Sequence, residues 1–80
     1  MHTDKSIPLA EAVPGMVYRI SSMEEHPITT RLLSMGIRPG ANVIVVRTAA
    51  FGQTLYLKTE RQQFGIRRDE AQRIWVFSEM

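Results

Sequence analysis

The 80-residue chain contains no cysteine, so neither a disulfide bridge nor a thiolate zinc site can reinforce its core. It also lacks any apolar run near the roughly 18 residues that cross a bilayer, and the opening MHTDKSIPLAEAVPG has no signal-peptide core. We therefore expect no direct insertion into a membrane, and a reducing, cytoplasmic location fits these absences.

Catalytic and metal-binding groupings are also missing. The segment GIRPGA at 36–41 matches neither a P-loop nor a dinucleotide fingerprint, and no nucleophile has a base at a recognisable spacing. EEHP at 24–27 has suitable ligand types for Fe(II), but consecutive residues of an extended loop point in different directions. We therefore expect no enzymatic activity and no bound metal or other cofactor.

Charge of either sign is modest. The chain has a net charge of +2, with 44% hydrophobic and 22% charged residues, as in folded proteins of one small domain. Residues 26–80 hold eight basic and four acidic residues, and this excess keeps a small nucleic-acid-binding β-barrel as the alternative function. The arginines are scattered, however, so a solvated surface is favoured and no nucleic-acid partner is expected.

The chain has five glycines and four prolines, and pairs of them mark the expected turns. Pro14-Gly15 and Pro39-Gly40 each combine a preset φ with tolerance of positive φ, and the second pair fits a type II turn. The start of the chain is expected to be loosely ordered, and the segment IPLAEAVPG that follows it, at 7–15, ends in the first pair. Short strands are expected at residues 16–23, 42–48, 54–60, 61–68 and 73–77.

The expected strands differ in their patterns. Residues 42–48 include four apolar residues in succession, which predicts a strand covered on both faces. Residues 54–60 alternate, with leucines on one side and Tyr56 on the other, which predicts one exposed face and a hairpin with the preceding strand. Gly65 suggests a bulge, a tight bend or the close approach of another backbone.

A change of periodicity predicts a helix over about residues 28–35. Ile28, Leu32 and Met35 recur at i, i+4 and i+7, and Leu33 widens the same stripe. Either the whole stripe plugs one end of the fold, or Leu32 or Met35 stays exposed and lines an apolar groove for a partner. The spacing alone leaves both readings open.

Capping signals flank this helix. Thr29 or Thr30 can accept a hydrogen bond from an N-terminal amide, and Gly36 can take the left-handed conformation after the last helical residue. Such an ending would fold Ile37 back onto Leu32.

The inventory of elements predicts a mainly β protein. Five short strands, tight turns and two helical pieces are typical of a small SH3-like barrel, in which closure protects the strand edges. The second helical piece is a turn near residues 69–72 with Asp69 as its cap. The last strand is expected to pair with the first, and an OB-like barrel is the main alternative.

Four motifs in order, PG at 14–15, RLLSMGIRPG at 31–40, VIVVRTAAFG at 43–52 and GIRRDEAQRIWV at 65–76, resemble the FeoA family. The resemblance covers about residues 9–77 of a single domain. It implies a small cytoplasmic SH3-like accessory protein of bacterial ferrous iron uptake. It also implies a partner, FeoB, the membrane transporter for Fe(II) with a cytosolic guanine-nucleotide-binding domain.

Five side chains are candidate contacts with such a partner. Leu32 and Met35 would line the groove, and Arg31 beside them would supply charge to an acidic partner. Tyr56, on the polar side of its strand, and Phe51, in a turn, are the aromatic candidates for the surface. Weak self-association through a strand edge or the helix groove is a further expectation.

Overall fold

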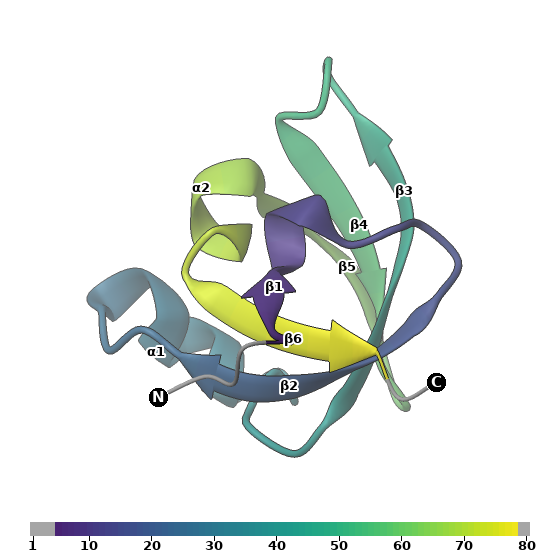
Figure 1. The fold of residues 1–80 in the computed structure, drawn as a ribbon. Helices are drawn as coiled ribbons and strands as arrows, with labels where there is room; N and C mark the ends of the chain where they lie inside the picture. The colour runs from purple at the N-terminus through teal and green to yellow at the C-terminus, as the bar shows by residue number, and fades with distance from the viewer. Residues whose placement is uncertain (1–4, 79–80) are drawn as a thin grey trace.

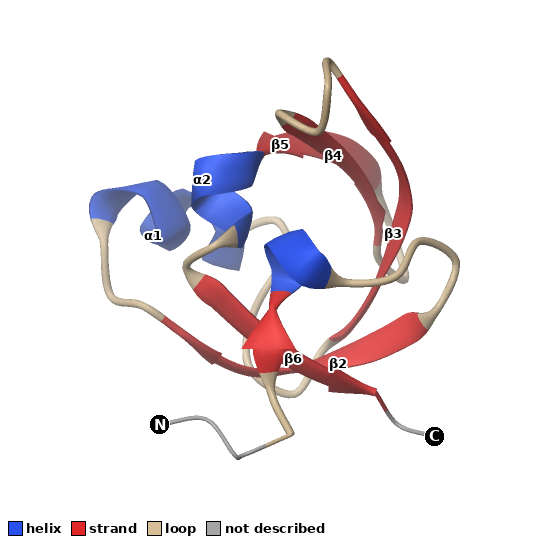
Figure 2. Ribbon diagram, turned by 45° about the horizontal axis from the view of Figure 1, so that its top comes forward, coloured by secondary structure: helices blue, strands red, loops and turns tan. Residues whose placement is uncertain are grey.

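A computed structural model describes residues 5–78 as one strongly curved antiparallel sheet with short helices beside it (Figures 1 and 2). The strands are β1 Ile7–Pro8, β2 Val17–Met23, β3 Asn42–Ala49, β4 Thr54–Lys58, β5 Gln63–Arg67 and β6 Ile74–Ser78. The helical pieces are a 3₁₀ turn at Leu9–Glu11, α1 at Pro27–Leu33 and α2 at Arg68–Ala71. No helix among the described residues is long and apolar enough to span a membrane.

The order of strands in the sheet is β1-β6-β2-β3-β4-β5. The predicted hairpin of β3 with β4 is confirmed, and so is the pairing of the last strand with β2. The mainly β class is therefore confirmed. The predicted closure is not found in residues 5–78, since β1 and β5 stand at the two ends of the strand order and no ladder joins them.

The N-terminal segment contains a strand and a 3₁₀ turn that were not predicted. Strand β1 adds a sixth strand by pairing with β6, with Pro8 opposite Trp75. The 3₁₀ turn that follows packs against β6 and α2, and its Leu9 is completely buried. A two-residue strand that contains proline has too few residues for a periodic pattern, so the sequence did not predict it.

The turns have the predicted geometry. The Ala41 N–H donates to the Arg38 carbonyl at 3.0 Å, and Gly40 between them has a φ of +92°. This bond and this dihedral angle confirm a type II turn, which needs a residue with positive φ at its third position. Gly15, with a φ of +91°, occupies the corresponding position of the first turn.

Strand β3 is covered on one face only. Val43 and Val45 are completely buried, whereas Val46 is 45% exposed. A bulge between Val45 and Arg47 breaks the register with β4. The prediction of burial on both faces was wrong, because the curved sheet encloses a single core and the outer side of β3 faces solvent.

Strand β4 alternates as predicted, with Leu55 and Leu57 buried and Tyr56 turned outward. Tyr56 lies opposite Gly65 of β5, and a Cβ atom on Gly65 would come within 3.3 Å of the tyrosine ring. The β4–β5 register has no shift, so the bulge is excluded there. A close approach does explain the glycine, but the neighbour is an aromatic ring rather than a backbone.

Candidate partner-binding site

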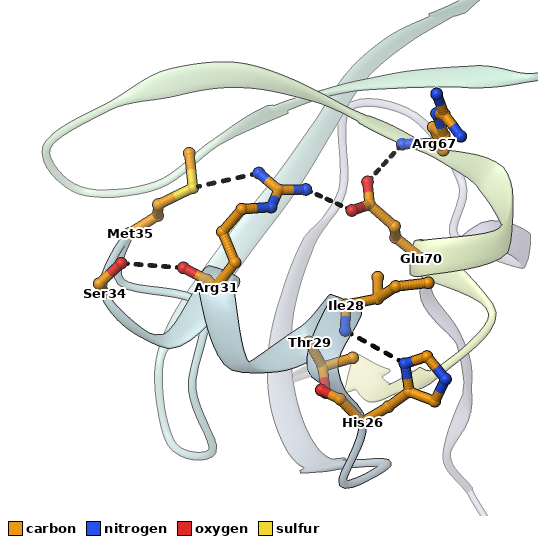
Figure 3. Close-up of polar contacts among 8 residues, drawn as sticks. All are labelled: His26, Ile28, Thr29, Arg31, Ser34, Met35, Arg67 and Glu70. Carbon is orange, nitrogen blue, oxygen red and sulfur yellow. Dashed lines mark hydrogen bonds and ion pairs between the residues drawn. The ribbon is translucent and has the colours of Figure 1, made fainter.

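Helix α1 begins with a histidine cap. The His26 Nδ1 accepts a hydrogen bond from the Ile28 N–H at 3.1 Å, and Pro27 takes the first helical position, where its missing N–H costs nothing (Figure 3). Thr29 is buried instead, and its hydroxyl donates to the Glu24 carbonyl at 2.6 Å. The predicted threonine caps were therefore wrong, because an imidazole earlier in the chain takes that role.

The end of α1 follows the prediction closely. Gly36 has a φ of +89°, the Ile37 N–H donates to the Leu32 carbonyl at 3.1 Å, and the Gly36 N–H donates to the Leu33 carbonyl at 3.2 Å. This pair of bonds is the Schellman ending of a helix. It folds Ile37 back so that both Ile37 and Leu32 are completely buried. Leu32 is thus a core residue, which corrects its place among the candidate partner contacts.

The apolar stripe of α1 divides between core and surface. Met35 is half-buried and packs against the core, whereas Leu33 is 47% exposed. Adjacent helical residues lie about 100° apart, so a buried Leu32 turns Leu33 outward. Leu33 is therefore a surface residue, although the spacing argument had placed it on the same side of the helix as Leu32.

Leu33 and Met35 line a groove of about 670 Å³ between the loop after α1 and the β4–β5 turn, which we name the helix-end groove. Ala41 adds a third apolar side chain. Charged side chains of the lining come from both walls and are Arg38, Glu60 and Arg61. Sequence reasoning missed the β4–β5 turn as a wall of this groove, because nothing in a linear pattern relates residues 59–62 to the end of α1.

Arg31 links α1 to α2. Its guanidinium pairs with the carboxylate of Glu70, and another of its nitrogens lies 3.9 Å from the Met35 sulfur (Figure 3). Glu70 is buried, and its Oε1 accepts the Arg67 N–H at 2.8 Å. Arg31 remains 55% exposed, so its charge serves the fold and still faces solvent.

The same carboxylate also organises the start of α2. Arg67 holds the position before the helix, and Glu70 reaches back to its N–H. The predicted cap, Asp69, lies inside the helix instead. Glu70 is buried and takes the capping role in place of Asp69, and the sequence pattern did not reveal that burial.

The aromatic candidates lie apart from the helix-end groove. Tyr56 carries the Arg47 guanidinium 4.1 Å above its ring centroid. It lines a second cavity of about 450 Å³, the edge groove, together with Arg31 and Gly65. Phe51 is fully exposed in the turn between β3 and β4, with a φ of +57°, and lines neither groove. The five candidates therefore form no single patch.

The EEHP segment is used for structure. Glu24 pairs with Arg73 at 2.6 Å, and His26 caps α1. Within residues 5–78, no three His, Cys, Asp or Glu side chains gather closely enough to hold a metal ion.

Comparison with known proteins gives a consistent result. A family model for the FeoA domain matches residues 7–77. The solution structure of FeoA from Chlorobium tepidum has a TM-score of 0.84 at 27% identity, covering 92% of this chain and 71% of that one. The zinc complex of Stenotrophomonas maltophilia FeoA, a prokaryotic SH3 domain protein, has a TM-score of 0.77 at 25% identity, covering 88% of each chain. No curated protein sequence matches.

A manganese-dependent transcriptional repressor shares the fold, with a TM-score of 0.84 at 18% identity over 96% of this chain and 44% of that one. The likeness to an SH3 domain protein confirms the predicted SH3-like class over the OB-like alternative.

Proposed function

The chain belongs to the FeoA family, which is linked to ferrous iron transport, and on this premise we propose that it is a non-enzymatic regulator of that transport. It docks from the cytoplasm onto the cytosolic part of FeoB and modulates Fe(II) transport or the transporter's nucleotide cycle. The observation that carries this proposal is the family match over residues 7–77. The Stenotrophomonas maltophilia relative, described as a candidate activating factor of bacterial ferrous iron transport, supports the regulatory role.

The helix-end groove is the docking surface in this proposal. Its lining combines apolar side chains, among them Leu33 and Met35, with the charged side chains of Arg38, Glu60 and Arg61. Protein interfaces likewise combine apolar and polar side chains. Methionine adapts its shape to a partner. Arg31 lies directly beside Met35, so an acidic group of the partner would meet a cation at the edge of the groove.

A binding titration against the transporter's soluble domain, and then against the full-length transporter, tests this function. We expect saturable binding to at least one form, weakened about tenfold or more by Met35→Asp, because a charge in an apolar contact costs its desolvation. Val13→Asp is the matched control, since Val13 is 54% exposed and outside the groove. Binding to neither form would refute the function, and equal weakening by both variants would refute the docking surface.

The nucleic-acid alternative gains no support from the structure. Arg31 and Arg73 pair with acidic residues, and Arg68 donates to the Gly52 carbonyl at 3.2 Å. Three of the basic side chains therefore have structural roles. We expect no complex with RNA or DNA whose affinity falls steeply with salt.

A further inference from the structure

Strand β5 is the last strand of the sheet. The backbone N–H and C=O groups of its successive residues point alternately toward β4 and toward the free edge. The Arg68 N–H donates to the Gln53 carbonyl at 2.9 Å, and the Thr59 N–H donates to the Gln62 carbonyl at 2.8 Å. These bonds continue the β4–β5 register by one residue pair at each end. Hydrogen-bonded and non-hydrogen-bonded pairs alternate in an antiparallel ladder. Every second residue of β5, counted from its first, therefore turns its N–H and C=O away from β4.

The residues with this orientation are Gln63, Gly65 and Arg67. Arg67 shows it directly, because its N–H donates to Glu70 rather than to β4. The Glu70 carboxylate thus occupies the free edge as a substitute for a neighbouring strand, and its other oxygen meets Arg31. At the next outward position, Gly65 has no side chain to hinder the approach of another backbone.

The edge groove lies beside these exposed backbone groups. Ile28 and Arg31 of α1 form one wall, and Gly65 and Arg67 of β5 form the other. Its volume of about 450 Å³ is within the range of roughly 300–1,000 Å³ found for ligand sites. The Tyr56 ring extends over Gly65, so an added strand would meet an aromatic surface next to its backbone.

The charges around the edge groove favour an anionic occupant. Arg47, Lys58 and Arg67 lie on the exposed face of β3, β4 and β5. The acidic residues of the lining are Asp69 and Glu70, and the second is already paired. The lining itself holds as many cations, Arg31 and Arg67, as carboxylates, so the positive excess comes from Arg47 and Lys58 on the adjoining strand face. An occupant with acidic side chains on this face would be attracted to it.

We propose that the free edge of β5 binds an extended acidic segment of a partner protein by strand addition. The outward backbone groups of Gln63 and Gly65 pair with the segment, and its carboxylates meet Arg47 and Arg67. A second copy of this chain is a poorer occupant, because edge pairing would bring two sets of these cations together. The site is separate from the helix-end groove and goes beyond the docking proposed above.

A synthetic peptide tests this site without the transporter. The probe is a blocked Glu-Val-Glu-Val-Glu peptide, titrated into the ¹⁵N-labelled full chain and followed by amide chemical shifts. We expect saturable shifts centred on Gln63 and Gly65. Replacement of the central glutamate by proline, which removes a backbone donor, should weaken binding about tenfold.

Two protein variants separate strand addition from nonspecific attraction. Arg67→Glu should weaken the peptide about tenfold, whereas Lys5→Glu, with the same charge change at an exposed residue before β1, at the other end of the strand order, should change affinity less than about twofold. Gln63→Pro should weaken binding without loss of folding stability, because the N–H that it removes faces away from β4.

Three results would overturn the proposal. The first is the absence of saturable shifts at Gln63 and Gly65. The second is equal binding of the proline-containing peptide. The third is a dimer that forms through β5 as the concentration rises in sedimentation and that the acidic peptide does not displace.

Discussion

Leu32 and Leu33 are adjacent in the sequence but have opposite environments. Leu32 is completely buried in the single core, whereas Leu33 is exposed on the helix-end groove. We expect Leu32→Ala to lower the free energy of unfolding by about 2–5 kcal/mol, because it leaves a cavity in the core. Leu33→Ala should lower it by less than about 0.5 kcal/mol. Urea denaturation of the two variants measures the difference.

The transporter titration gives the complementary readout for these residues. Leu33→Ala should weaken binding while folding stays unchanged. Similar losses of stability in both variants would contradict the assignment of Leu32 to the core and Leu33 to the surface.

The spacing of apolar residues in α1 predicted a stripe but not its orientation. The i, i+4 rule placed Leu32 and Leu33 on one side, and only the return of Ile37 onto Leu32 determines which of them is buried. The glycine signal at Gly36 did predict that return. The histidine cap was not predictable in the same way, because imidazole is not among the usual capping side chains.

At the scale of the element, α1 depends on its caps. It has seven residues, and isolated helices shorter than about 12 residues are marginal in water. We expect His26→Ala to lower the free energy of unfolding by about 0.5–2 kcal/mol, because the Ile28 N–H loses its acceptor. In thermal unfolding, each kcal/mol corresponds to about 4–8 °C for a domain of this size.

A conservative variant distinguishes capping from a loss of packing. His26→Asn supplies a side-chain oxygen at the same position and should recover most of the lost stability. If His26→Asn is as unstable as His26→Ala, the imidazole stabilises α1 through some contact other than the cap.

The strands were more predictable than the helices. Alternation over residues 54–60 identified the buried face of β4. In a sheet with one covered side, a period of two means that the apolar residues face the core and the others face solvent. The continuous apolar run in β3 was misleading, because Val46 stays exposed beside a bulge. Met35 was predicted as a groove residue, but the second wall of the helix-end groove and the whole edge groove were not predictable, since each is formed by segments that only the folded sheet brings together.

At the scale of the whole molecule, the N-terminal segment completes the core of an open sheet. Leu9 belongs to the same buried cluster as Leu32 and Val76, although these residues come from the start, middle and end of the chain. Since there is one core, the segment should unfold together with the sheet rather than before it.

This cooperativity leads to a prediction for Leu9→Ala. The lost side chain should lower the free energy of unfolding by about 2–5 kcal/mol, as in any fully buried site. The single tryptophan, Trp75, lies opposite Pro8 of β1 and reports on the docking of the segment, whereas far-UV circular dichroism reports on the sheet. Both signals should shift to lower urea by the same amount and keep coincident midpoints. A tryptophan transition that precedes the loss of dichroism would show that the segment detaches alone, and that the remaining strands form a stable core without it.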